Sequence, residues 1–261
     1  NDIIDTINLV LNHFEMANVS PWLSKVNSSL KGTVNGDIFI LSDSLINKVF
    51  SEITTSNLVL NDANFGALNL SFDYDDTQDI QLIQGHSLKD DKKALEFSGN
   101  YNSLVDSNNM QIFIDVNDFN INHINTYLPF LDPLKGMFTG YLNLYGNINE
   151  PKFEGKFVAK EVYLTVPYLN VDFKTIGESN VHLSHDLIEL NNFSFQSLGK
   201  GNSFGTGALS GKFNHHYFSD INMDLNLELD SILCLNTDAF SDNSYFGKVI
   251  STGDVAFNGQ P

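Results

Sequence analysis

Short runs of alternating apolar and polar residues recur along this chain, and glycines separate them. The clearest run is Tyr141-Leu142-Asn143-Leu144-Tyr145, which Gly140 precedes and Gly146 follows. A period of two places successive side chains on opposite faces of a β-strand, whereas an amphipathic helix would need a period of 3.6. The stretch from Leu134 to Phe173 therefore predicts a β-meander with one apolar and one polar face, in which the glycines permit bends.

The same pattern returns at long intervals. Leu30-Lys31-Gly32-Thr33-Val34-Asn35-Gly36 matches the segment from Leu134 to Gly140, 104 positions later, at its leucine, its lysine and both glycines. Upstream of these segments, INLVLNHFEM from Ile7 aligns with IFIDVNDFNI from Ile112, at an offset of 105. Self-similarity at a nearly fixed period is typical of a repeat architecture in which each unit stacks on its neighbours.

A third copy begins before the chain ends. SGNYN at Ser98 corresponds to SGKFN at Ser210, MQIFIDV at Met110 to MDLNLEL at Met223, and GYLNLYG at Gly140 to GDVAFNG at Gly253. We therefore predict one repeat unit over residues 1–108, a second over 109–220 and the start of a third over 221–261. Because the last copy stops inside its motif, we expect the chain to be a segment of a longer protein.

These observations predict an all-β fold: an elongated, open β-solenoid or curled, taco-shaped sheet with a hydrophobic concave groove. Separate small sandwiches are the alternative, and the absence of a linker between the units disfavours them. A few short helical turns are expected as well. The expected strands of the first unit are 3–18, 32–41, 54–61, 67–74, 80–88 and 94–101. The expected helical turns are Ser20–Val26, 43–53 and Asn122–Leu131.

Charge excludes one class of partner. The chain has 32 acidic residues, 14 lysines and no arginine, which gives a formal net charge of -18. Nucleic-acid binding needs clustered cations, so we expect no nucleic acid as a partner. Cys234 is the only cysteine, so it cannot form an internal disulfide, and its SILCL context predicts a small, buried apolar side chain on a strand.

No pattern of residues predicts catalysis, a cofactor or a metal. The glycine-rich segment from Gly199 to Gly207 lacks the following helix of a phosphate-binding loop and is interpreted as a turn between strands. The histidine pairs His182/His185 and His215/His216 diverge on strand-like sequence. A calcium loop from Asp73, Asp75, Asp76 and Asp79 lacks the EF-hand glycine and terminal glutamate. We therefore expect a protein that is not an enzyme.

Three segments together carry a family resemblance: YLNLYGNINEPKFEGKFVAKEVYLTVPYLNVDF, INMDLNLELDSILCLNT and SYFGKVISTGDVAFNGQP. Through its repeats, the chain resembles the TamB-like translocation and assembly module proteins of Bacteroidetes-type bacteria. The resemblance implies an AsmA-like groove protein of the periplasm, which in full length is anchored in the inner membrane. It also implies a role in moving phospholipid to the outer membrane, or in assembling outer-membrane proteins with a BamA/TamA-type barrel partner.

If a groove carries phospholipid acyl chains, the apolar positions of the alternating runs should line it. The expected lining residues are Leu142, Leu144, Val162, Leu164, Leu169, Val171, Phe173, Leu225, Leu227 and Leu229. Two other functions fit the same pattern. The chain could act as an assembly factor for outer-membrane β-barrels through its strand edges, or as a structural stalk or adhesin whose facing side chains fill the groove.

Overall fold

The computed structural model describes residues 5–18, 30–42, 47–60, 63–77, 79–89, 92–122, 133–199, 202–216, 219–237 and 246–260. Strands make up nearly all of these residues. In chain order they are β1 (Asp5–Glu15), β2 (Leu30–Ser42), β3 (Asn47–Leu60), β4 (Ala63–Asp75), β5 (Ile80–Lys89), β6 (Lys92–Asn102), β7 (Met110–Asn120), β8 (Leu134–Asn147), β9 (Glu150–Val166), β10 (Val171–Thr175), β11 (Glu178–Ser184), β12 (Leu187–Gly199), β13 (Asn202–His216), β14 (Ser219–Thr237) and β15 (Gly247–Gly259). A 3-10 turn, η1 (Met16–Asn18), follows β1.

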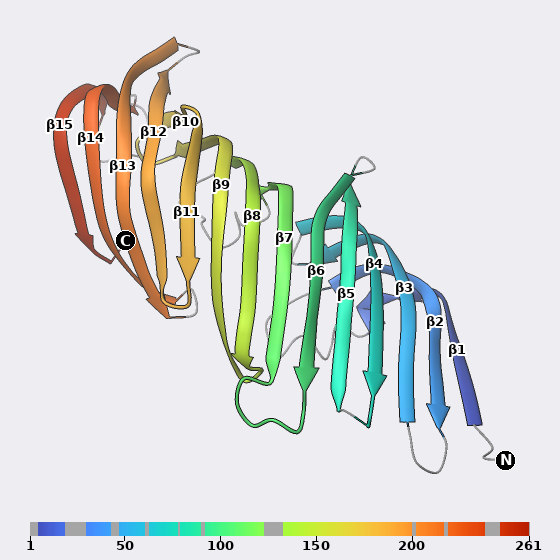
Figure 1. The fold of residues 1–261 in the computed structure, drawn as a ribbon. Coiled ribbons are helices and arrows are strands. Elements are labelled where there is room, and N and C mark those ends of the chain that lie inside the picture. The colour runs from blue at the N-terminus through green and yellow to red at the C-terminus, as the bar shows by residue number, and fades with distance from the viewer. Residues whose placement is uncertain are drawn as a thin grey trace. The chain divides into compact units, whose positions relative to one another are not determined.

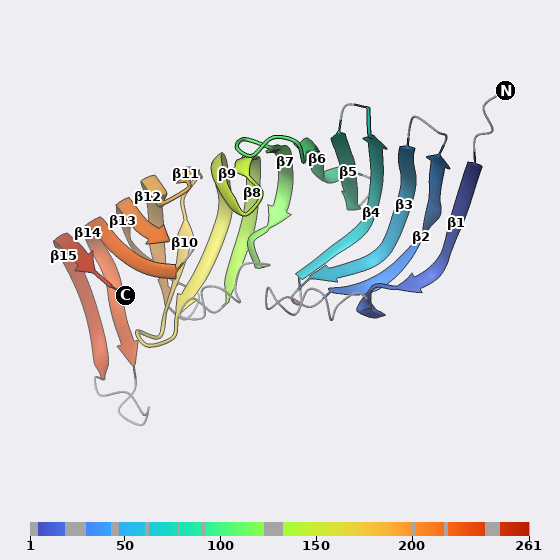
Figure 2. The ribbon, with the colours of Figure 1, turned by 90° about the horizontal axis from the view of Figure 1, so that it is seen from below.

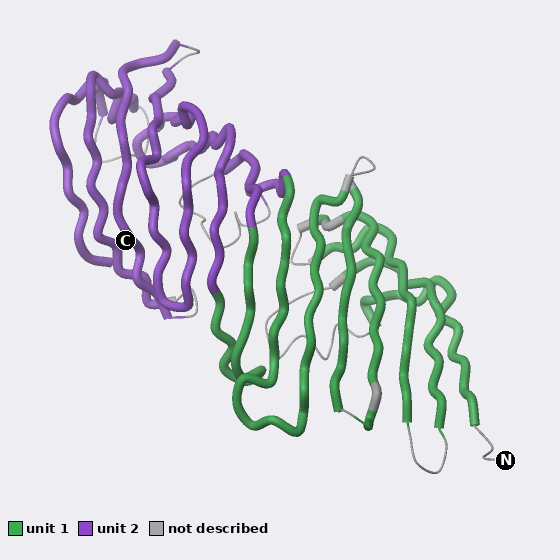
Figure 3. The backbone as a smooth tube through the Cα atoms, in the orientation of Figure 1, with its two compact units in different colours: residues 1–117, 141–153 green, residues 118–140, 154–261 purple. Residues whose placement is uncertain are grey.

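The fold is a fifteen-stranded sheet in which every recorded pairing is antiparallel and the strands follow the order of the chain (Figure 1). The short strands β10 and β11 together occupy one position in the sheet, since each pairs with β9 on one side and with β12 on the other. The all-β prediction is therefore confirmed. Two compact units divide the chain (Figure 3): unit 1 contains residues 1–117 and 141–153, and unit 2 contains residues 118–140 and 154–261.

Most sequence-predicted strands are present, and several local predictions are wrong. Residues 16–18 form the 3-10 turn η1 rather than strand, and Cys234 is half-buried rather than buried. Residues 47–53 form the first half of β3 rather than a helix, because their alternating side chains pair with β2 and β4. Leu169 belongs to the β9–β10 turn, and its strand begins only at Val171. The predicted helical turns at Ser20–Val26 and Asn122–Leu131 lie outside the described residues, apart from Asn122. Among the described residues, no helix has the length and hydropathy to cross a membrane.

The long strands bend at β-bulges, and Figure 2 shows the bending of β2, β3 and β4 in unit 1. Several long strands contain one non-glycine residue in a left-handed conformation, in some cases at a bulge in the strand register. Examples are His13 (φ 50°), Asn57 (φ 50°), Asp118 (φ 49°), Glu161 (φ 50°) and Ser231 (φ 56°). A bulge adds one residue to one strand of a pair, which bends that strand and increases its twist.

Three of these bulges share one hydrogen bond to a neighbouring strand. The backbone N–H of His13 donates to Oδ1 of Asn35 (2.8 Å), that of Asp118 to Oγ1 of Thr139 (3.1 Å), and that of Ser231 to Oγ1 of Thr252 (2.9 Å). The donors and the acceptors are each related by the offsets of the sequence repeat. The same bulge hydrogen bond therefore recurs at equivalent positions of the three aligned sequence copies. The boundaries of the repeat units stay a prediction.

Removal of one such acceptor tests whether the hydrogen bond stabilises the bend. We expect Thr139→Val to lower the free energy of unfolding by about 1 kcal/mol, because the Asp118 N–H loses its protein acceptor. Thr139→Ser keeps the hydroxyl and should stay within about 0.5 kcal/mol of the parent. Urea unfolding followed by circular dichroism gives both values. No loss in Thr139→Val would contradict the prediction, and a loss in Thr139→Ser as large as that in Thr139→Val would show that the hydroxyl alone does not account for the effect.

Candidate functional site

Unit 1 has an apolar face made of four rows of side chains that run across its strands. Residues paired across an antiparallel sheet lie on the same face, so the strand registers define each row. The first row is Ile7, Ile40, Val49, Tyr74, Gln81, Tyr101 and Met110; the second is Leu9, Ile38, Ser51, Phe72, Ile83, Gly99 and Ile112; the third is Leu11, Gly36, Ile53, Leu70, Gly85, Phe97 and Ile114; the fourth is Phe14, Val34, Thr55, Leu68, Ser87, Leu95 and Val116.

None of these residues is charged, whereas the opposite face of the same strands is rich in charge. That polar face carries Asp37, Lys48, Glu52, Asp73, Glu96 and Asp115. Over these seven strands the four rows are uncharged, whereas the opposite face mixes charged residues with exposed apolar ones such as Val10, Leu82 and Phe113. On the face of the four rows, a charged group would lack a counter-ion.

The apolar face of unit 1 is not sealed like the core of a globular domain. Ile7 is 55% exposed and Leu9 is 48% exposed, and most other members of the rows are half-buried. Neighbouring side chains do close its smallest gaps. A Cβ atom at Gly85 would lie 2.6 Å from the ring of Phe97, so the glycine makes room for that ring. The face is therefore apolar, with much of its hydrocarbon surface still accessible.

Unit 2 repeats the arrangement with its own strands. Its apolar face contains five cross-strand rows, again with no charged member. The rows are Gly155, Leu183, Ile188, Phe213, Met223 and Gly259; Phe157, Val181, Leu190, Gly211, Leu225 and Phe257; Phe193, Leu209, Leu227 and Val255; Thr175, Phe195, Gly207, Leu229 and Gly253; and Leu164, Phe173, Ser197 and Phe204. The polar face of unit 2 holds the ion pair Lys160–Glu178 (3.0 Å) and the His182–Glu189 contact (3.3 Å).

The structure places seven of the ten expected lining residues on the apolar face of unit 2. Leu164, Phe173, Leu225, Leu227 and Leu229 are members of its rows. Val162 and Val171 lie on the same face, because each precedes a row member, Leu164 or Phe173, by two positions in its strand. Leu142 and Leu144 lie in unit 1. Their neighbour Tyr141 stacks on Phe113 of the polar face (5.8 Å between centroids), which puts both leucines on the opposite, apolar side. Leu169 lies in a turn.

Three of the ten residues are buried by protein. Val162 is 5% exposed and belongs to a cluster with Ile121, Leu134 and Ala159. Leu225 is 9% exposed and Val171 only 1%. Buried side chains offer hardly any surface to an acyl chain, so accessible lining in unit 2 comes from half-buried residues such as Leu164, Phe173, Leu227 and Leu229.

One end of unit 2 is a packed core rather than an open surface. Ile232, Leu233 and Ser197 are at most 1% exposed. The Leu233 N–H donates to Oγ of Ser197 (2.8 Å), and that hydroxyl donates to the Phe204 carbonyl (2.9 Å). The Asn236 N–H donates to the carbonyl of Leu169 (3.0 Å), so the end of β14 lies against the β9–β10 turn. Leu169 itself is held in the turn, because its N–H donates to the Val166 carbonyl (3.0 Å) and the next N–H, of Asn170, donates to the Pro167 carbonyl (3.1 Å).

The rows of unit 1 do not follow from alternation within single strands. Individual strands such as Ile80–Leu88 were recognised, but their lining residues were not. The signal was present, because Leu68, Leu70 and Phe72 alternate with Asn69, Ser71 and Asp73. What the sequence lacked was the register that aligns those residues with Ile53 on β3 and Ile83 on β5.

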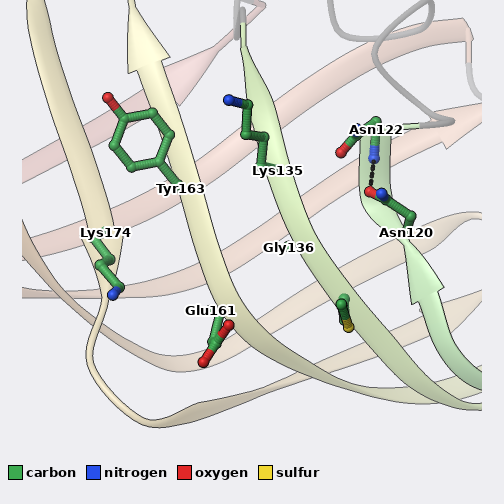
Figure 4. Close-up of a pocket in the computed structure, with 8 residues that line it drawn as sticks. Asn120, Asn122, Lys135, Gly136, Glu161, Tyr163 and Lys174 are labelled. Atoms are coloured by element: carbon green, nitrogen blue, oxygen red, sulfur yellow. Dashed lines mark hydrogen bonds between the residues drawn. The ribbon is translucent and has the colours of Figure 1, made fainter.

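A shallow depression of about 350 Å³ lies on the polar face of unit 2 (Figure 4). It is lined by Asn120, Asn122, Lys135, Gly136, Met137, Glu161, Tyr163 and Lys174. Tyr163 pairs with Lys174 across β9 and β10, opposite the apolar face. Partial burial, followed by a hydrogen bond to Asp172, raises the pKa of Tyr163 above its usual value of 10.0, so its hydroxyl is protonated at neutral pH. The depression mixes two lysines with a glutamate and holds no recognisable catalytic arrangement.

The other candidate sites from the sequence have structural explanations. Asp76 Oδ2 accepts hydrogen bonds from the backbone and side chain of Asn47 (2.7 and 2.8 Å), so this carboxylate stabilises a turn. Within the described ranges, no group of three or more His, Cys, Asp or Glu side chains has a geometry that could hold a metal ion. After Gly199, the described chain resumes as strand β13 at Asn202.

His215 makes the stability of unit 2 depend on pH. Burial lowers its pKa from 6.5, His185 and His216 lower it further, and Asp186 opposes them. Because the folded state disfavours the proton, the stabilising contribution is present above pH 6.5 and is lost as the pH falls below it. We expect the urea midpoint to fall between about pH 7.5 and 5, and less steeply in His215→Asn. Equal slopes in the parent and in His215→Asn would contradict this.

Comparison with known proteins gives no relative: no family model, no curated protein and no solved structure matches the chain. The two apolar faces are therefore the features of this chain that bear on its function.

Proposed function

We propose that this chain is a periplasmic groove segment that carries phospholipid acyl chains between the inner and outer membranes. The observation that supports this proposal is the uncharged apolar face in each unit, extended across many paired strands and still partly accessible. The resemblance to TamB-like proteins agrees with such a role. In this proposal the full-length protein is anchored in the inner membrane, and a BamA/TamA-type barrel is a partner through other parts.

The energetic need for such a surface is large. A phospholipid with two acyl chains would expose about 30 methylene groups to water during transfer, at about 0.8 kcal/mol each, or roughly 24 kcal/mol. A barrier of that height limits spontaneous transfer to roughly once a day. An apolar face lowers the barrier without chemistry, because it replaces contact with water by contact with Leu, Ile, Val and Phe side chains.

Native mass spectrometry of the chain, purified without detergent from a Gram-negative periplasm, tests this proposal. We expect adducts whose masses equal those of phospholipids, and we expect extraction with organic solvent to remove them. A chain that stays free of lipid, even after incubation with phospholipid vesicles, would contradict the proposal.

The edge strands of the sheet support a second candidate function, the assembly of outer-membrane β-barrels. Among the described strands, β1 pairs only with β2 and β15 only with β14, and β15 is exposed along nearly its whole length. An exposed edge can accept an additional strand through main-chain hydrogen bonds. If this function holds, an unfolded outer-membrane barrel protein should slow amide hydrogen exchange in β15. Unchanged exchange in both β1 and β15 would exclude edge pairing with that substrate.

A further inference from the structure

Of the four rows on the apolar face of unit 1, the first lies nearest the β4–β5 turn and is the most polar. Tyr74, Gln81 and Tyr101 occupy consecutive strands in this row, since Tyr74 pairs with Gln81 and Gln81 pairs with Tyr101. The second row has Phe72, Ile83 and Gly99 at the same three strands. Tyrosine presents an apolar ring and a polar tip, which suits the boundary between hydrocarbon and water. This row therefore marks the water-facing edge of the face.

A carboxylate is held at that edge. The Tyr74 hydroxyl donates to Oδ1 of Asp79 (3.2 Å), and the Ser103 hydroxyl donates to Oδ2. Because Tyr74 belongs to the apolar face, its hydrogen bond places the Asp79 carboxylate beside that face rather than across the sheet. An ionised carboxylate can accept about four hydrogen bonds. Two donors orient it and leave acceptor capacity for a ligand.

The chemistry of this edge suits an ammonium group. A carboxylate forms charge-assisted hydrogen bonds with ammonium, and tyrosine rings attract cations through their π faces. Lys48, on the adjoining end of β3, lies on the polar face, since its neighbour Val49 belongs to the apolar one. A phosphate group without an accompanying amine would meet the negative charge of Asp79 and gain no cation from the first row.

The dimensions of the face also fit a lipid. Its four rows are two residues apart along each strand, so they span about 20 Å between the first row and the fourth. Half of a bilayer's hydrocarbon core, the depth of one extended acyl chain, is about 15 Å. A lipid whose head group lies at Asp79 would therefore have its chains over the apolar rows toward Thr55, just before the bulge at Asn57.

We propose that Asp79, with Tyr74 and Tyr101, selects amphiphiles whose head group carries an amine, of the ethanolamine type, over anionic ones. This selectivity rests on the proposed lipid-carrying function and adds a head-group preference to it. Asp79 binds the ammonium group, Tyr74 and Ser103 hold the carboxylate in position, and the tyrosine rings flank the cation.

Affinities for two lysophospholipids with the same acyl chain test the selectivity. Lysophosphatidylethanolamine and lysophosphatidylglycerol are titrated below their micelle concentrations into the purified, delipidated chain and counted by native mass spectrometry. We expect the ethanolamine lipid to bind roughly tenfold more tightly, equivalent to about 1.4 kcal/mol. Asp79→Asn should reduce this ratio of affinities to about one, chiefly by weakening the binding of the ethanolamine lipid. Tyr74→Phe, which removes only the hydroxyl donor, should reduce the ratio by a smaller factor.

Asp115→Asn is the matched control, since it removes one carboxylate from the polar face of the same unit. It should leave the ratio unchanged, which separates a local effect of Asp79 from the protein's overall negative charge. A ratio near one in the parent protein, or a ratio that survives Asp79→Asn, would overturn the selectivity while leaving the lipid-carrying function intact. Failure of both lipids to bind would refute the function itself. If Asp79→Asn unfolds, the selectivity is tested by the affinity ratio of the parent protein and by the fall in that ratio in Tyr74→Phe.

Discussion

Val162→Asp is expected to unfold unit 2. The Val162 side chain is 5% exposed and lies in the cluster of Ile121, Leu134 and Ala159, with Phe138 and Leu164 packed against that cluster. A carboxylate there would lose its hydration with no cation to replace it. Burying an unpaired charge costs about 3 to 5 kcal/mol, a large part of the stability of an ordinary domain. The substituted aspartate would have to protonate, or the unit would have to open.

Val158→Asp is the matched control on the same strand. Val158 pairs with Asn180 on the polar face, where Lys156 and Lys160 are its neighbours two positions away. The same carboxylate in this position should change the free energy of unfolding by less than about 1 kcal/mol. Urea titration followed by near-ultraviolet circular dichroism measures both variants. Similar losses in Val162→Asp and Val158→Asp would show that unit 2 does not have the two-faced packing described here.

Leu227→Asp is expected to weaken lipid binding at this part of unit 2 without unfolding the unit. Leu227 is half-buried and pairs with Leu209 and with Val255, which is 37% exposed. Water can reach a carboxylate at this position, so the folding penalty is smaller than at Val162. An acyl chain crossing the same position would have to strip that water from the charge, at a cost of several kcal/mol. Lipid occupancy at this part of the face should fall at least tenfold.

Asn226→Asp provides the comparison, because Asn226 is exposed on the opposite face of β14 and pairs with Ser210 and Ala256. It adds the same charge one residue away and should leave both folding and lipid occupancy unchanged. If Leu227→Asp unfolds unit 2, the face is a filled core and a stalk-like function is favoured. If the folded variant takes up lipid as well as the parent does, Leu227 is not part of the lipid-binding surface.

The sequence predicted the faces well because alternation is a local property. Leu225, Leu227 and Leu229 share a face whatever their neighbours are, and the repeat offsets correctly relate Asn35, Thr139 and Thr252. Burial is not local. Val171 is sealed where the end of β14 lies against the β9–β10 turn, a contact between residues far apart in the chain that alternation cannot reveal.

The candidate site shows the same division. Leu164 and Phe173 could be assigned to one face from their own strands, and their pairing in the structure agrees. The edge carboxylate of unit 1 could not be anticipated, because Asp79 appeared only as one of several acids in a polar turn. Its significance depends on the hydrogen bond from Tyr74, and so on the face to which Tyr74 belongs.

Site-specific photo-crosslinking tests the central claim, that the uncharged face carries lipid, most directly. A photoreactive amino acid is placed at Leu227 or, on the other side of the same strand, at Asn226, and the chain is irradiated in cells or with phospholipid vesicles. Covalent phospholipid adducts, identified by mass spectrometry, should form at position 227 and be absent at position 226. Adducts of equal yield at the two positions, or none at position 227 in a folded protein, would contradict the account.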